Sequence, residues 1–480
     1  MTPAREGTGS QDSLFDAVSK AAPRVDAMIL ATASGQWSFA EILAAAERFA
    51  DHIARQRTSG LLVVAQVSDA AATAIVALAC DLAEVPVVHS DPAAPVVMDG
   101  LIVRDAHTHQ PEDQAARWGS DRSPALWTHL QGAPVSLASV APRSQIFLTS
   151  GSSGTPLGVV RPAAKVLVDC HRIADFLGYE DGRPVLVSTP AFHSYGFTYG
   201  LLAAMLRGAA SVHRSPRSLP SQLARTAAQL APRTLIGLPF TFQLIAKADR
   251  DDFPGLRQAV SSGAPLPPDV AAAVAASHAF ALHNAYGSSE TGAVSLARIH
   301  GEPRHGDVGR PLPRIGVRLD TAITAVAADP ERDAGGGELL LSTDSLASGY
   351  LGPNGLLPLA VEGEWYRTGD LADVRDGQLR LLGRVSDVIN VAGEKVRPIE
   401  IERVLLEHPL VREAQVFASP DATRGQIPVA RVVASGALAE EDVLRWCRQH
   451  LAPHQLPRRI DFLDELPRSA TGKRIKGLAT

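Results

Sequence analysis

The 480-residue sequence predicts an α/β fold, with a large N-terminal domain of several subdomains and a small α+β domain at the C-terminus. Three observations lead to this prediction. Short apolar runs alternate with amphipathic segments, which favours helices layered on a largely parallel sheet. Around residues 306–382 the pattern changes to shorter β-like runs separated by Gly, Pro and Asp, which predicts a β-rich, barrel-like subdomain. After residue 383 the pattern changes again, to strand-like and helix-like segments that alternate over just under 100 residues.

The layered part is predicted element by element from the spacing of its apolar residues. Short apolar runs bounded by turn formers are expected to form buried strands at residues 61–67, 185–188 and 234–238. Helical spacing of apolar side chains marks residues 39–55, 165–177 and 221–230. Strands that alternate with helices in this way are typical of α/β layers.

In the β-rich part, Asp376-Gly377 stands between two alternating segments and predicts a tight hairpin turn. We place the domain boundary after this hairpin, so that residues 1–383 form the N-terminal domain and residues 384–480 the C-terminal one. The C-terminal domain is expected to begin with a strand. Its later elements are predicted as a helix, a strand, a helix and a strand at residues 398–406, 411–417, 440–451 and 458–464.

The composition excludes several classes of protein. The net charge is −5 and no basic block occurs, so nucleic acid is not expected as a partner. The 3 cysteines lie far apart, which argues against structural disulfides and zinc sites. The chain has no leader-like apolar run and no stretch long enough to span a membrane, so we expect a cytoplasmic protein. Lysine is scarce, with six against forty arginines.

Six segments together resemble the ANL superfamily of adenylate-forming enzymes, which includes acyl- and aryl-CoA synthetases, peptide-synthetase adenylation domains and luciferases. Residues 146–158 (IFLTSGSSGTPLG) run from a strand into a small-residue loop of the kind that wraps anions, although this loop lacks the lysine of a Walker P-loop. The other segments are SSGAPL (261–266), NAYGSSE (284–290), WYRTGDL (365–371), GRVSDVINVAGEKVRPIEIE (383–402) and PRSATGK (467–473).

The resemblance implies an ATP site. The phosphate loop is matched by Thr149, Ser150, Gly151, Ser152, Ser153 and Gly154. Glu290 matches the Mg²⁺ ligand, a hard oxygen donor suited to a metal that bridges phosphates. Tyr286 would stack on adenine, Asp370 would accept hydrogen bonds from the ribose hydroxyls, and Arg384 would lie near the ribose. The other side of the adenine would be covered by Gly263, Ala264 and Pro265.

The remaining matches concern the acid, the hinge and the second half-reaction. Lys473 matches the catalytic lysine that reaches the α-phosphate and the substrate carboxylate. Ser386 matches the hinge, and the resemblance implies that the small α+β domain after it is mobile. Gly393 and Lys395 match the loop of the thioester-forming state, although Lys395 is equally explained as a surface cation. The acid pocket is matched by His193, Phe197, Gly287 and Ser288. His193 is either a pocket wall or a packed core residue.

The sequence departs from the superfamily pattern at two positions. Leu157 replaces the usual lysine of the phosphate loop, so one charge contact to ATP is missing, and Arg161 is a conjectural substitute. Ser386 replaces the usual Asp or Lys at the hinge. A small polar residue there could still absorb the backbone change of a domain rotation.

The implied function is ATP-dependent activation of a carboxylic acid, either small and aromatic or of short to medium chain, to an acyl-AMP with release of pyrophosphate. The acyl group would then pass to a thiol, either CoA or the phosphopantetheine of an acyl carrier protein, with Mg²⁺ as cofactor. Two alternatives stay open: a ligase with an amine or another non-thiol acceptor, and a catalytically degenerate nucleotide- or acyl-binding regulator. We expect a monomer or homodimer.

Replacing Lys473 by alanine is expected to slow acyl-adenylate formation about 100-fold or more, because one stabiliser of the developing charge is lost. The measurement is single-turnover pyrophosphate release. Release close to the wild-type rate would contradict the assignment.

Overall fold

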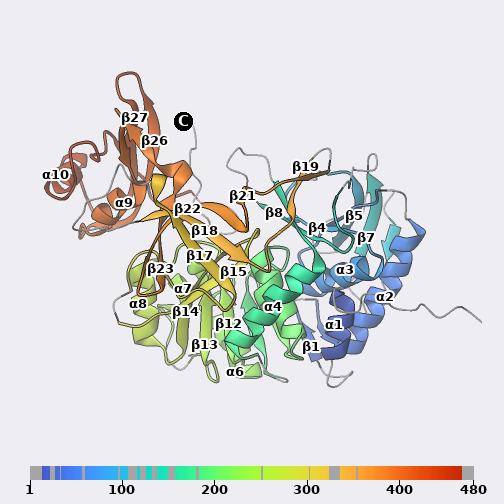
Figure 1. Ribbon diagram of the computed structural model, residues 1–480. Helices are drawn as coiled ribbons and strands as arrows, with labels where there is room; N and C mark the ends of the chain where they lie inside the picture. The colour runs from blue at the N-terminus through green and yellow to red at the C-terminus, as the bar shows by residue number, and fades with distance from the viewer. Residues whose placement is uncertain are drawn as a thin grey trace, which may run out of the picture.

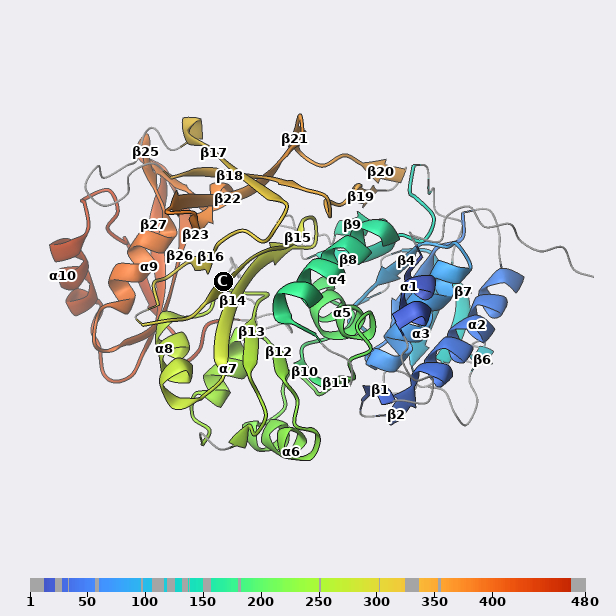
Figure 2. The same ribbon diagram turned by 60° about the horizontal axis from the view of Figure 1, so that its bottom comes forward.

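The computed structural model describes residues 13–21, 28–32, 34–56, 60–95, 98–105, 116–118, 126–131, 137, 139–149, 157–179, 183–249, 252–301, 303–323, 336–352 and 355–467. Four sheets and their covering helices make up this part of the chain, and the predicted α/β class is confirmed. The sheet of residues 389–462 lies with its two helices at one end of the molecule, and the N-terminal helices lie at the other end (Figures 1 and 2).

The first large sheet has eight strands and is parallel at its centre, with antiparallel strands at both edges. Its order is β15 (Gly292–Arg298), β14 (Ala281–Ser288), β13 (Gln258–Ser261), β12 (Thr234–Gly237), β10 (Val185–Ser188), β11 (Ser211–His213), β1 (Met28–Ala31) and β2 (Gln36–Ser38). The strands predicted at 185–188 and 234–238 are therefore confirmed, and every residue of β10 and β12 is buried.

The second large sheet has nine strands and is parallel from β8 to β5. Its order is β20 (Gly355–Leu357), β19 (Gly349–Gly352), β9 (Leu157–Arg161), β8 (Gln145–Thr149), β4 (Val87–His89), β3 (Val63–Gln66), β5 (Gly100–Asp105), β7 (Leu126–Gln131) and β6 (Ala116–Trp118). The phosphate-loop motif joins β8 to β9, which pair antiparallel. The motif therefore lies within a hairpin.

Helices cover the sheets and bury one large hydrophobic core. It contains α3 (Ala70–Leu82), which is buried along nearly its whole length, with the inner faces of α1 (Leu14–Ala21), α2 (Phe39–Arg55), α4 (Ala163–Leu177), the π-helix η1 (Gly196–Leu202) and α5 (Ala203–Met205). The helix predicted at residues 39–55 is confirmed with the same bounds as α2. Ser38 and Glu41 form a reciprocal capping box that fixes its start. The other face of the first sheet packs on α6 (Pro220–Leu230), α7 (Pro239–Ile245) and α8 (Pro268–Ser277).

The β-rich part predicted at residues 306–382 is an antiparallel sheet of six strands. It contains β16 (Asp307–Gly309), β23 (Gln378–Arg384), β22 (Trp365–Arg375), β18 (Gly337–Thr343), β17 (Ile315–Asp320) and β21 (Val361–Glu362). In the described residues its end strands do not pair, so the sheet is open rather than closed into a barrel, and residues 349–352 and 355–357 of this range join the second large sheet instead. The hairpin predicted at Asp376-Gly377 joins β22 to β23, with φ of 53° and 73° at its two central residues. Positive φ at both positions is what a two-residue hairpin with the twist of its strands requires.

The C-terminal sheet contains β25 (Glu394–Val396), β24 (Ile389–Val391), β27 (Gly425–Ala434), β26 (Val411–Asp421) and β28 (Ile460–Phe462), with α9 (Pro398–Leu406) and α10 (Glu440–His450). All the predicted elements of this region are present. The prediction missed β27, which pairs with β24, β26 and β28. This strand contains Pro428. Proline lacks the N–H that pairing with a neighbouring strand needs, so its presence in the sequence disfavours a strand inside a sheet.

Among the described residues, we find no helix with both the length and the apolar character that a bilayer crossing requires. Cys80, Cys170 and Cys447 are buried and unbridged, as predicted.

A buried charge network joins α4 to the edge of the first sheet. Arg161, at the end of β9, donates to Asp169 Oδ2 over 3.1 Å, and neither side chain is exposed. Asp169 Oδ1 accepts the backbone N–H of Ala293 over 2.9 Å. Gly292 has φ of 73°, and a Cβ there would lie 2.3 Å from Asp169 Oδ2. Only glycine therefore fits at the start of β15.

Replacing Asp169 by alanine is expected to lower the free energy of unfolding by about 3–5 kcal/mol, because Arg161 would be left as an uncompensated buried charge. Asp175→Ala on the same helix is the matched control. Its ion pair with Arg207 is partly exposed, so the loss there should stay below about 1 kcal/mol. Urea denaturation of both variants measures the difference, and equal losses would contradict this account of the network.

Candidate active site

Three residues of the predicted nucleotide site meet at one point. Tyr286, near the end of β14, donates its hydroxyl proton to Asp370 Oδ2 over 2.7 Å. Arg384 Nε donates to Asp370 Oδ1 over 2.9 Å, and the two residues are directly opposite each other on β23 and β22. Burial, and after it the Asp370 carboxylate, raise the pKa of Tyr286 well above its usual range. Tyr286 therefore stays a proton donor, and both oxygens of Asp370 are held.

The adenine-side segment lies beside this group. Ser262, directly after β13, donates its hydroxyl to the carbonyl of Ala285 over 3.0 Å, so the turn is tied to the strand that carries Tyr286. Gly263 has φ of 86°, a left-handed conformation that favours glycine. Ala264 and Pro265 continue the same turn.

Glu290 lies in the turn between β14 and β15. Its carbonyl accepts the N–H of Ala347 over 2.7 Å, and its Oε1 accepts the hydroxyl of Tyr350 over 3.1 Å. Within the described residues, Oε2 has no hydrogen-bond partner. This leaves one hard oxygen donor open, which fits a magnesium ion whose other ligands are phosphates and water. The described residues contain no cluster of three or more metal-binding side chains.

The phosphate-loop residues are described only at their ends. Thr149 donates its hydroxyl to the carbonyl of Leu157 over 3.3 Å, across the β8–β9 pair. Leu157 is 37% exposed at the start of β9. The predicted loop residues Ser150, Gly151, Ser152, Ser153 and Gly154 lie outside the described residues.

Arg161 does not take the place of the missing loop lysine, and that conjecture is wrong. Its side chain has no exposed surface and is bound to Asp169 and to the carbonyl of Ser345. Side chains alternate along a strand, so Leu157 and Arg161, four residues apart, point to the same face of the sheet. However, the end of β9 that carries Arg161 is buried, so its side chain cannot reach a ligand.

The residues predicted for the acid pocket divide into two groups. His193 packs on Phe192 with 4.6 Å between ring centroids, and burial lowers its pKa, so the imidazole is neutral at pH 7. The neighbouring Ser194 is 3.0 Å from Ser289 through their hydroxyls, which joins this segment to the turn of Glu290. Gly287 and Ser288 are the last residues of β14 and lead into that turn, and Ser288 contacts Thr291 through their hydroxyl oxygens at 3.2 Å.

Phe197 is not a pocket wall in this conformation. It is 1% exposed and packs against His89 and Phe147, with ring centroids 4.9 and 5.4 Å away. The π-helix η1 turns this side chain into the core between the two large sheets. The sequence could not distinguish the two locations, because an aromatic residue suits both.

The remaining predicted residues lie after Asp370. Ser386 is exposed in a short 3₁₀ turn, Val385–Asp387, that leads out of β23. Gly393, with φ of 96°, forms the tip of the β24–β25 hairpin, and Lys395 is exposed on β25. Lys473 lies outside the described residues.

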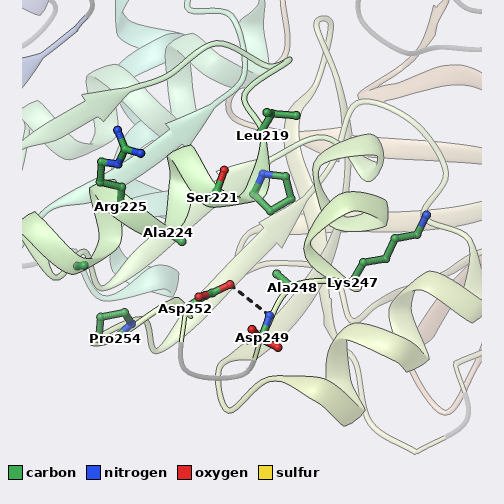
Figure 3. A pocket seen from close by; sticks show the side chains of 11 residues that line it. Leu219, Ser221, Ala224, Arg225, Lys247, Ala248, Asp249, Asp252 and Pro254 are labelled. Atoms are coloured by element: carbon green, nitrogen blue, oxygen red, sulfur yellow. Dashed lines mark hydrogen bonds between the residues drawn. The ribbon is translucent and has the colours of Figure 1, made fainter.

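A separate hollow lies between α6 and the segment that follows α7 (Figure 3). Its described lining includes Arg225 and Lys247 as basic groups and Asp249 and Asp252 as acidic groups, and no described residue of the six motif segments is among them. The two signs balance, so the lining favours no one charge of ligand.

Two family models match the chain. One, described as AMP-binding enzyme, matches residues 63–351, and the other, described as AMP-binding enzyme C-terminal domain, matches residues 400–473. The chain belongs to the AMP-binding enzyme family. The resemblance drawn from the motifs is thereby confirmed. The matched ranges include the segments 146–158, 261–266, 284–290 and 467–473 and the end of 383–402, and the segment 365–371 lies between the two ranges.

Two similar proteins are named as a CoA ligase and a CoA synthase. A 2-succinylbenzoate–CoA ligase from Bacillus cytotoxicus is 30% identical over 344 residues, which cover 70% of this chain and 70% of the relative. A feruloyl-CoA synthase from an Amycolatopsis species is 29% identical over 340 residues, which cover 69% and 68%. ATP-bound MatB from Rhodopseudomonas palustris shares the fold, with a TM-score of 0.79 and 22% identity over 96% of this chain and 97% of that chain.

Several site residues were missed at the level of sequence. Tyr350 contacts the predicted residue Glu290, Ser194 and Ser289 contact each other, and Asp169 binds the backbone of Ala293 just after the turn of Glu290. Ser194 follows His193 and Ser289 lies within the NAYGSSE segment, so adjacency could have found them. Tyr350 and Asp169 are distant in sequence from Glu290, and no local signal indicates their contacts.

Replacing Leu157 by lysine is expected to tighten ATP binding by this AMP-binding enzyme roughly three- to tenfold, because a cation is restored at the exposed start of β9. Isothermal titration calorimetry with ATP measures the effect. Leu130→Lys, at an exposed position on β7 of the same sheet, is the control for a general gain of positive charge. Equal gains in both variants would show that position 157 has no special access to the phosphates.

Proposed function

We propose that the chain joins ATP to an aromatic carboxylic acid to form an acyl-AMP and pyrophosphate, and then transfers the acyl group to the thiol of CoA. The observation that supports this most directly is the meeting of Tyr286, Asp370 and Arg384 from three strands. An aromatic face, a carboxylate and a guanidinium are thereby held together, as binding of an adenosine group requires. The Glu290 turn follows directly from the strand that carries Tyr286.

In the first step a carboxylate oxygen of the acid attacks the α-phosphorus of ATP, and the bond to the pyrophosphate oxygen breaks. The site residues would act by position and charge. Asp370 would accept the ribose hydroxyls, with Tyr286 and Arg384 fixing the orientation of its carboxylate. Lys473 would neutralise the charge that develops between the acid and the α-phosphate. The phosphate loop would hold the pyrophosphate through N–H and hydroxyl donors.

Glu290 would hold a magnesium ion, which supplies charge neutralisation between phosphate oxygens when it is bound. The open Oε2 supports this role. Because a single carboxylate is typical of magnesium sites that share their coordination with phosphates, the described residues need not supply a second one.

The preference for an aromatic acid rests on the lining near Glu290. His193 and Phe192 present ring surface, while Ser194 and Ser289 offer hydroxyls beside it. Both curated relatives are named for acids that carry an aromatic ring. We propose that this ring surface receives the ring of the substrate.

The second step needs a different arrangement of the two parts of the chain. We propose that residues 1–383 form the nucleotide and acid domain, and that residues 384–480 form a lid that rotates about Ser386. The lid would present Lys473 for adenylation, and then Gly393 and Lys395 for attack of the thiol on the acyl-AMP. Exposure of Ser386 and of the β24–β25 hairpin agrees with such a motion.

ATP–pyrophosphate exchange with a panel of acids tests the first step. We expect exchange that depends on benzoate- or cinnamate-type acids and is weaker with short aliphatic acids. Thioester formation from the best acid is then measured with CoA, with a phosphopantetheinylated carrier protein and with amines, and CoA should be the preferred acceptor. Binding of ATP without exchange for any acid would instead favour a nucleotide-binding regulator.

A further inference from the structure

The carboxylate of Glu290 is held by a residue from a distant part of the sequence. Tyr350 lies on β19, which pairs with β9, and its register partner Val159 is two residues after Leu157. Its hydroxyl donates to Glu290 Oε1 over 3.1 Å. Tyr350 therefore spans from the phosphate-loop hairpin of the second sheet to the Glu290 turn of the first sheet.

A second tyrosine continues this contact. Tyr366 on β22 is 6% exposed, and its hydroxyl lies near that of Tyr350. Tyr366 lies four residues before Asp370 on the same strand. The three side chains form a line from the β-rich sheet through β19 to Glu290, in which each hydroxyl can donate to the next oxygen.

The hydroxyl of Tyr350 decides which oxygen of Glu290 stays accessible. It donates to Oε1, and within the described part of the chain no hydrogen bond is made to Oε2. Oε2 is therefore the oxygen that is open to a metal ion. The bond to Oε1 fixes the rotation of the carboxylate about its last torsion angle.

We propose that Tyr350 is a positioning residue that aims Glu290 Oε2 at the magnesium ion of bound ATP, and that Tyr366 supports it by hydrogen-bonding to its hydroxyl. This inference rests on the proposed role of Glu290. Groups that orient a metal ligand by hydrogen bonding commonly contribute 10- to 100-fold to metal affinity. The contribution has added weight here because Leu157 supplies no charge to the phosphates.

The test measures the magnesium dependence of ATP binding by calorimetry, in the absence of acid, so that no turnover contributes. Tyr350→Phe should raise the half-saturating Mg²⁺ concentration about tenfold. Tyr366→Phe should raise it about threefold, because it removes only the supporting hydrogen bond. The double variant should match Tyr350→Phe, since the line is already broken at Tyr350.

Tyr179→Phe is the matched control. Tyr179 is a buried tyrosine whose hydroxyl donates to the carbonyl of Tyr199 over 2.9 Å, away from Glu290. It loses a buried hydroxyl as the test variants do, and its magnesium dependence should equal that of the wild type. Thermal unfolding of each variant checks that the fold is retained, and Tyr366→Phe alone decides the proposal if Tyr350→Phe does not fold.

Glu290→Gln distinguishes a failure of Glu290 as the metal ligand from a failure of Tyr350 as the positioning residue. If it leaves the magnesium dependence unchanged, the assignment of Glu290 as the metal ligand fails. If Glu290→Gln raises the required magnesium concentration while Tyr350→Phe and Tyr366→Phe behave like Tyr179→Phe, only the positioning role is overturned.

Discussion

Asp169 has no exposed surface, and its carboxylate holds Arg161 on one side and the backbone N–H of Ala293 on the other. This one side chain joins the second large sheet, through Arg161 on β9, to the first large sheet, through the start of β15. Because Gly292 passes so close to the carboxylate, the turn before it has little freedom. Glu290 belongs to that turn. The position of the proposed metal ligand therefore depends on an ion pair between Arg161 and Asp169 that is fully buried.

The two carboxylates that we propose to act in the site share a mode of support. Asp370 receives the hydroxyl of Tyr286, and Glu290 receives that of Tyr350. In each case a tyrosine kept protonated by burial occupies one oxygen and orients the other. The second oxygen of Asp370 is held by Arg384, which leads into the 3₁₀ turn of Ser386. The proposed ribose site and the proposed hinge are thus connected by the ion pair of Asp370 and Arg384.

Local patterns were reliable where local physics decides the structure. The α2 helix begins at its capping box, and the Asp376-Gly377 hairpin follows from two residues that tolerate positive φ. Motif residues such as Tyr286 and Asp370 were placed together by resemblance, and they do meet. Patterns were misleading where burial decides. Arg161 and Phe197 suited a site by residue type, yet both are buried in the core. The prediction also missed β27, which contains Pro428 although other strands pair with it.

The sequence by itself determined the α/β class, most elements of the C-terminal region, the family, and the departures from the family pattern at Leu157 and Ser386. These follow from spacing, turn chemistry and motif order, which are properties of neighbouring residues. Only the tertiary structure decided which side chains support the site. Asp169, Tyr350 and Tyr366 act on the Glu290 turn from other strands and helices. Contacts between residues far apart in the chain depend on how the sheets pack, and no local pattern records that packing.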